Sequence, residues 1–203
     1  MFFRTMQVKT TLLMVLVFSF MSSSGQKFNA GILGGISTSQ VDGDHLSGFH
    51  KAGLKAGGFV SRKIGERMQL QFEMEFIQKG SRLPLSKDGV FYLMRLNYIE
   101  VPLLVNYRLG KKWTIEAGGA FATLVSTYEE DQLGEITNAP PFHSADYLVC
   151  VGGNYFITDH LIFNARYSYS VTTIRPKNEN YNYFYFIGGQ YNKVLAFSLE
   201  WKF

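Results

Sequence analysis

The sequence contains very little cysteine or proline. It has one cysteine, Cys150, and five prolines among 203 residues. A lone cysteine excludes an internal disulfide, so the fold must be stabilised in another way. A closed β-sheet needs no such crosslink, because it leaves no strand edge unpaired. After residue 25, no segment keeps apolar residues at helical spacing for three turns, which argues against a helical fold.

The chain also lacks a concentrated positive charge. It carries 20 Lys and Arg against 16 Asp and Glu, and two of the basic residues, Arg4 and Lys9, lie within residues 1–25. The remainder is nearly neutral and has no basic cluster of the kind that nucleic acid requires, so we expect no nucleic-acid partner. Gly-rich phosphate loops and zinc motifs are also missing, so we expect no cofactor.

Residues 1–25 have the layout of a secretory signal peptide. Arg4 and Lys9 precede an apolar run over residues 12–21, and small residues follow at 22–25. The run is too short for a membrane-spanning helix, which needs about 20 residues. We therefore predict cleavage before Gln26, leaving residues 26–203 as an exported domain. The alternative is a buried N-terminal helix. No cysteine follows the run, so we expect no lipoprotein anchor.

Alternation between apolar and polar residues is the main signal after residue 25. In residues 68–76, Met, Leu and Phe occupy the even positions while Gln and Glu occupy the odd ones, as in a strand with one apolar face. Aromatics make up 16% of the chain and glycines number 20, which suits strands and turns. Together with 68–76, the expected strands are 28–37, 52–63, 99–109, 113–121, 147–157, 161–171 and 195–203.

The connections between these segments alternate in length. Residues 64–67, 110–112 and 158–160 form short turns, whereas 38–51, 80–92, 127–144 and 173–192 are longer. This pattern predicts an all-β fold: a closed antiparallel up-and-down transmembrane β-barrel of about eight strands, located in the cell outer membrane. Its apolar face would contact outer-membrane lipid. The alternation does not by itself show which face of the sheet is inside. It therefore also allows a soluble lipocalin-like barrel with an apolar interior and a polar outer surface.

Charged residues occupy the polar side of these strands. A narrow lumen would exclude water, so unpaired charges there would be costly and we expect them to pair. An acid–base site is the functional alternative, because close carboxylates can differ in protonation. The expected interior charge network consists of Glu73, Glu75, Glu100, Arg108, Glu116, Arg166, Glu200 and Lys202.

Candidate catalytic and metal-binding residues are few. His45 and His50 share a loop with two aspartates, but their spacing is a weak metal signal. His143 and Ser144 are adjacent, and neighbouring strand residues point to opposite faces, so they make a poor dyad. We therefore predict no catalytic and no metal site. A lipid-modifying barrel enzyme is the alternative.

The C-terminal segment has a pattern of its own. Leu199, Trp201 and Phe203 fall on the expected lipid face, and the segment closes on an aromatic residue. This resembles the terminal-strand signal read by the barrel-assembly machinery. We predict that these residues are an assembly signal and that this machinery is a partner.

Several motifs together resemble a known family. A Gly-rich strand at residues 30–37 (AGILGGIS) is followed by Asp42-Gly43-Asp44, then by 53–58 (GLKAGG), 73–81 (EMEFIQKGS) and, most specifically, 96–104 (LNYIEVPLL). Over most of residues 26–203 the chain resembles the PorT-like outer-membrane β-barrel proteins of Bacteroidetes. The resemblance implies an outer-membrane location and an eight-stranded barrel, but little about activity, although the namesake takes part in protein secretion.

The functional expectation combines these patterns. We expect a non-enzymatic outer-membrane barrel with a lumen filled by side chains, and with surface loops that bind an unknown protein or ligand. The best loop candidates are 38–51 and 173–192, because the second is rich in aromatic residues.

Overall fold

The computed structural model describes residues 28–44, 46, 48–84, 91–176 and 188–203. The expected signal peptide, His45 and the aromatic segment of the last long loop fall outside these residues. The strands are β1 (Phe28–Asp42), β2 (Lys51–Lys63), β3 (Met68–Leu83), β4 (Tyr92–Arg108), β5 (Trp113–Asp131), β6 (Gly134–Glu135), β7 (Ala145–Phe156), β8 (Leu161–Ser170), β9 (Arg175–Pro176) and β10 (Gly189–Lys202).

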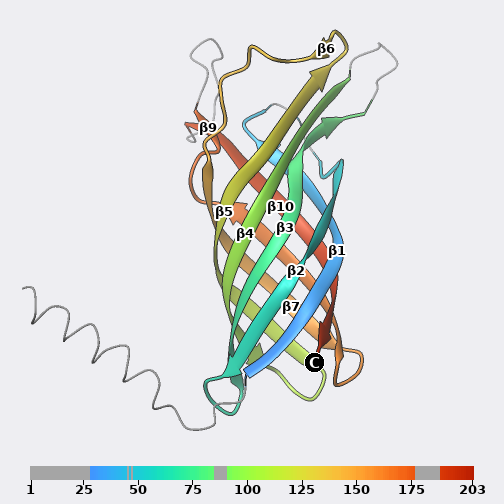
Figure 1. Ribbon diagram of the computed structural model, residues 1–203, viewed down its shortest axis with the longest axis vertical. Helices are drawn as coiled ribbons and strands as arrows, with labels where there is room; N and C mark the ends of the chain where they lie inside the picture. Colours follow the sequence, from blue (N-terminus) through green and yellow to red (C-terminus); the bar gives the residue numbers. More distant parts are fainter. Residues whose placement is uncertain (1–27, 45, 47, 85–90, 177–187) are drawn as a thin grey trace, which may run out of the picture.

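Eight long antiparallel strands form a closed ring in sequence order (Figure 1). Strand β1 pairs with β2 on one side and with β10 on the other, and β6 and β9 are two-residue additions. The expected up-and-down barrel of about eight strands is therefore confirmed. The start of β1, the end of β10 and the turns 64–67, 109–112 and 157–160 lie at one end, which is the end expected to face the periplasm. In the described part of the chain, no helix is long and apolar enough to span a membrane.

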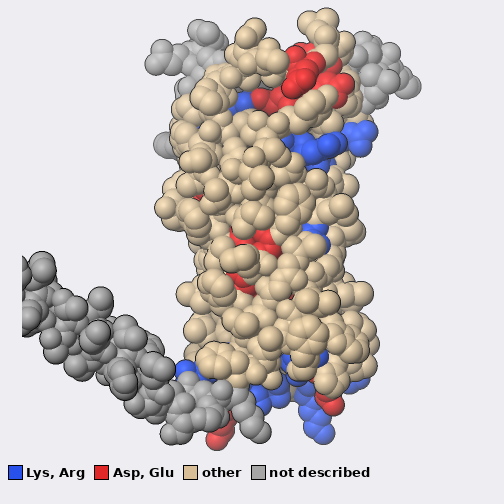
Figure 2. All heavy atoms as spheres, in the orientation of Figure 1, with Lys and Arg blue, Asp and Glu red and all other residues tan. Residues whose placement is uncertain are grey.

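The outward face of the barrel is apolar, and the inward face is polar at the same level. On β3, Phe72 and Met74 are exposed, whereas Gln71, Glu73 and Glu75 are buried. Figure 2 shows most of the visible charged atoms near the two ends of the barrel, with a few between tan side chains at mid-height. The inverted, lipocalin-like alternative is therefore wrong, because an aqueous barrel would not expose its apolar face and bury its acids.

Aromatic side chains form belts at two levels of the outer wall. Near the short turns, the rings of Trp113 and Tyr155 lie 4.7 Å apart between centroids. Near the long loops, Tyr169 stacks on Tyr191 at 6.2 Å. Aromatic girdles of this kind mark the two interfaces of a membrane with water.

The strands extend beyond their expected bounds on the side of the long loops. Strand β4 begins at Tyr92 rather than at residue 99, and β5 continues to Asp131 rather than to 121. In these extensions the pattern inverts: Met94 and Leu96 are buried inside, while Arg95 faces outward. The apolar filling of this upper lumen comprises Val41, Ile77, Met94, Leu96, Leu148, Ile174 and Val194, among others. The barrel thus continues above the membrane with an ordinary apolar core.

Candidate functional site

A buried ion cluster crosses the middle of the lumen. Arg166 on β8 donates to both carboxylate oxygens of Glu73 on β3, each at 2.7 Å, and to Glu116 on β5 at 2.6 Å. All three side chains are almost completely buried. In the ring of eight long strands, β3 and β8 are four places apart, so the Arg166–Glu73 pair joins opposite walls.

A glycine makes room for one arm of this cluster. Gly152 on β7 lies between Glu116 and Arg166 in the strand register, so their ion pair passes over it. A Cβ atom at Gly152 would lie 2.7 Å from Glu116 Oε1 and 2.5 Å from the Ala165 carbonyl oxygen. The missing side chain therefore permits a contact between two strands that are not neighbours.

A second buried cluster lies closer to the long loops. The Lys79 ammonium on β3 is 2.5 Å from Glu100 on β4 and 3.9 Å from Asp146 on β7. Ser170 and Asn192 donate to the same Asp146 oxygen, each at 2.9 Å. This cluster again connects strands on separated walls.

The structure brings together most, but not all, of the charges expected in the lumen. Besides the two clusters, Glu75 pairs with Lys55 at 3.1 Å. Glu200 is buried, yet it makes no ion pair with another described residue, and its Oε1 atom has no described hydrogen-bond partner. Arg108 and Lys202 lie at the periplasmic mouth instead, where Arg108 is exposed and Lys202 half-buried. These two residues do not belong to either buried cluster.

Two members of the second cluster, Lys79 and Asp146, are not among the charges expected in the lumen. Both have the inward parity of their strands, because Lys79 is two residues past the buried Ile77 and Asp146 is two before Leu148. Extending the alternation beyond residues 76 and 147 would have found them. The apolar residues Ile77 and Leu148 on the inward side hid that continuation.

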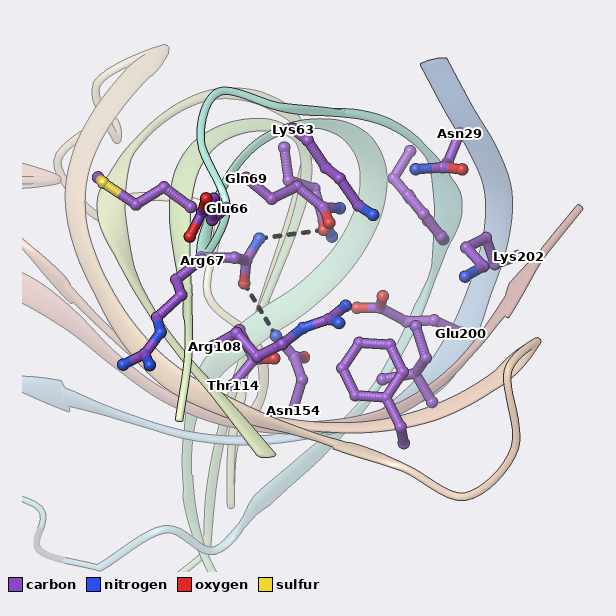
Figure 3. Close-up of a pocket in the computed structure, with 16 residues that line it drawn as sticks. Asn29, Lys63, Glu66, Arg67, Gln69, Arg108, Thr114, Asn154, Glu200 and Lys202 are labelled. Atoms are coloured by element: carbon purple, nitrogen blue, oxygen red, sulfur yellow. Dashed lines mark hydrogen bonds between the residues drawn. The ribbon is translucent and has the colours of Figure 1, made fainter. Parts of the chain in front are cut away.

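A cavity of about 140 Å³ occupies the periplasmic mouth (Figure 3). Its inner floor is a hydrogen-bonded amide row, in which Asn154 donates to Asn106 at 3.0 Å and Asn106 donates to Gln71 at 3.2 Å. Arg108 and Glu200 both line the cavity. Asn154 also donates to Glu116 at 3.1 Å, so the amide row connects the floor of the cavity to the Arg166 cluster.

The loop end of the barrel has a polar contact network above the membrane level. The Arg175 guanidinium binds Glu129 through both of its terminal nitrogens and lies 3.6 Å from the centre of the Phe142 ring. The Tyr92 hydroxyl donates to Glu129 at 2.6 Å. Burial, followed by this hydrogen bond, raises the pKa of Tyr92. These contacts hold the bases of two long loops against the barrel.

The described histidines show no catalytic arrangement. The His143 ring nitrogen Nδ1 lies 2.8 Å from the backbone oxygen of Thr173, and its ring makes no described hydrogen bond to Ser144. Among the described residues, no group of three or more potential ligands could hold a metal ion.

Comparison with known proteins identifies the family. Residues 19–175 match the family model described as "Outer membrane protein beta-barrel domain". The chain belongs to this family. Membership places the protein in the outer membrane, which agrees with the apolar outer wall and its aromatic belts. No curated protein sequence matches the chain.

Solved structures of outer-membrane barrels resemble this barrel in fold. Ail, the attachment invasion locus protein of Yersinia pestis, is 10% identical with a TM-score of 0.52, covering 87% of this chain and 99% of Ail. Neisserial surface protein A is 12% identical with a TM-score of 0.52, covering 87% of this chain and 97% of that protein. Ail has also been solved with the heparin analogue sucrose octasulfate, at 10% identity, a TM-score of 0.51 and 87% and 99% coverage.

Proposed function

We propose that this outer-membrane barrel is neither a pore nor an enzyme, and that it presents its long loops to a partner outside the cell. The observation that carries the proposal is the Arg166–Glu73 pair, which joins opposite walls of the ring. An eight-stranded barrel has an interior just wide enough for its own side chains. Any activity must then reside on the outer surfaces of the molecule.

Further filling on both sides of that pair supports a closed lumen. The amide row lies on the periplasmic side, and the Lys79 cluster and the apolar upper core lie on the other. A general diffusion pore needs more strands and an open lumen.

Solute uptake by proteoliposomes tests the closed lumen. Liposomes that contain the purified barrel should not swell in isotonic solutions of small sugars, whereas liposomes with a large porin should swell. Swelling at porin-like rates would show that the lumen is open. In the same liposomes, mass spectrometry of the phospholipids should reveal no time-dependent conversion, because a lipid-modifying enzyme would produce one.

Two features support a binding role for the loop end. The Arg175–Glu129 contacts hold loop bases in place, and a rigid surface loses less entropy when it binds a partner. A structural neighbour, Ail, has been solved with a heparin analogue. Sucrose octasulfate is a candidate ligand for a binding test. Replacing residues 132–144 by a short Gly-Ser linker should abolish binding of the partner but preserve folding of the barrel. If sucrose octasulfate binds the variant as well as the original protein, its binding site lies elsewhere.

Two finer assignments belong to the same proposal. The motif at residues 96–104 supports membership of the PorT-like group within the wider family. The aromatic C-terminal residues Trp201 and Phe203 support recognition by the barrel-assembly machinery during insertion.

A further inference from the structure

A row of polar side chains marks the upper limit of the lipid-facing wall. Gln78 on β3 donates to Asn97 on β4 at 3.1 Å, and Asn97 donates to Ser126 on β5 at 2.8 Å. On its other side, Gln78 accepts a hydrogen bond from the backbone of Leu54 on β2 at 3.2 Å. Just below this row, Ile99 faces outward. The wall therefore changes from apolar to polar at one level across four strands.

Two arginines project outward immediately above that row. Arg95 on β4 lies opposite Gly80, and Arg82 lies two residues farther along β3, so both are on the same stretch of outer wall. Both are exposed. Arg95 is two residues above Asn97, about 7 Å along the strand. Figure 2 shows basic side chains in this region of the wall, below the acidic ends of β5 and β6.

A third cation, Lys51 at the start of β2, is buried, unlike the two arginines. The β2–β3 ladder ends at the pair of Lys55 with Ile77, although β3 continues to Leu83, and Lys51 lies beyond that point. Its ammonium donates to the Ala52 carbonyl oxygen at 2.6 Å. Desolvation, and then repulsion by Arg95 and Arg82, lower the pKa of Lys51 to about 8.

No described carboxylate pairs with these three side chains within 4.0 Å. Arg95 instead lies 6.0 Å from the centre of the Tyr128 ring. A group of cations at this place calls for an anion from outside the described protein. Arginine binds phosphate oxygens in a fork geometry, through two N–H groups at once.

We propose that Arg82 and Arg95, backed by Lys51, bind the phosphate of a lipid headgroup in the outer leaflet. We choose a lipid headgroup as the ligand because of the position of the site. It lies directly above the apolar band, where the headgroups of lipids that contact Ile99 and its neighbours are located. This goes beyond the proposed function, because the site is on the wall and not on the loops.

Lipid retention measured by native mass spectrometry tests the proposal. The full barrel, refolded with phosphatidylcholine and a minor fraction of phosphorylated lipid A, should retain phosphorylated lipid A at least about tenfold more than dephosphorylated lipid A. The double variant Arg82→Gln/Arg95→Gln should lose that preference. The matched control, Arg62→Gln/Arg67→Gln, removes two arginines at the periplasmic end and should keep it.

Each contrary outcome overturns the proposal. Equal loss in both variants would mean that overall charge retains the lipid. Equal retention of dephosphorylated lipid A would mean that the acyl chains alone are held. Complete displacement by millimolar inorganic phosphate would mean that the site binds free phosphate and not a lipid. Heat-dependent gel migration shows that each variant is folded before the comparison.

Discussion

Buried acids in the lumen differ sharply in their surroundings. Glu73 receives both arms of the Arg166 guanidinium, whereas Glu200 has no described ion-pair partner. Removing one member of a buried ion pair leaves an uncompensated charge, which costs about 3–5 kcal/mol. Removing a buried charge that has no partner relieves a desolvation penalty instead. Chemically identical substitutions should therefore have opposite consequences at these two positions.

We predict that Glu73→Gln lowers the free energy of unfolding by about 3 kcal/mol or more. Glu200→Gln should leave it unchanged or raise it. Urea titrations of the barrel in lipid vesicles, followed by the fluorescence of Trp113 and Trp201, measure both changes. Similar destabilisation by the two variants would contradict the difference in pairing.

Two adjacent glycines provide a matched test of the space in the lumen. A Cβ atom at Gly152 would meet Ala165 and Glu116 at 2.5 and 2.7 Å, whereas one at Gly153 would find its nearest atom at 3.5 Å. We expect Gly152→Ala to destabilise the barrel by about 1–3 kcal/mol, as overpacking does. Gly153→Ala should change stability by less than about 1 kcal/mol. The same urea titration compares them, and equal effects would show that the Arg166 cluster can move aside.

The sequence could predict which side chains face inward, but it could not predict which of them form ion pairs with one another. Alternation predicts that Glu73, Glu116 and Arg166 lie on the inward side, and all three side chains are buried. Which inward residues meet depends on the tilt and stagger of the strands around the ring, and these are not encoded in any single segment. That is why Arg108 and Lys202 shared the right parity but lie at the mouth, outside the ion clusters.

Along each strand, the apolar residues face outward in the membrane zone and inward above it. In the membrane zone of β4, Leu103 and Val105 face outward, and in the zone above it Met94 and Leu96 face inward. An apolar outer face defines the expected strands, so these end where that face becomes polar. The number and order of strands and the short turns were predictable because a strand needs about 9–11 residues to cross the membrane, and alternation over that length is a clear signal.

Cysteine scanning along β4 should reveal where the outward face of the strand changes from contact with lipid to contact with water. In a Cys150→Ser background, a cysteine at Leu103 should react with a lipid-phase probe and resist a water-soluble maleimide. A cysteine at Arg95, which is exposed above the polar row, should show the reverse preference. A cysteine at Leu104, which is buried inside, should resist both reagents. Water-soluble labelling at Leu103 would contradict the assignment of the lipid-facing wall.

At the scale of the whole molecule, closure depends on the seam between β1 and β10. Strand β10 pairs with β1 over twelve residue pairs and with β8 on its other side. At the periplasmic end of the seam, the Phe203 amide donates to Ala30 and the Lys202 amide donates to His160. Loss of residues 201–203 would therefore open both sides of β10 at once. Closure could be predicted because a sheet that spans a membrane cannot leave a strand edge unpaired, but the exact register of the seam could not.

We predict that deletion of residues 201–203 leaves the protein unassembled and degraded in cells. Substitutions can separate an assembly signal from simple anchoring by aromatic rings. Trp201 and Phe203 are about as exposed as Trp113 and Phe28, which lie at the same end of the barrel on other strands. If the machinery reads β10, Trp201→Ala/Phe203→Ala should strongly reduce outer-membrane levels, whereas Trp113→Ala/Phe28→Ala should reduce them little. Both pairs lose the same kind of interfacial aromatic surface, so membrane anchoring alone predicts equal losses. Immunoblots of fractionated outer membranes measure the levels, and normal amounts of the β10 variant would refute its role as a signal.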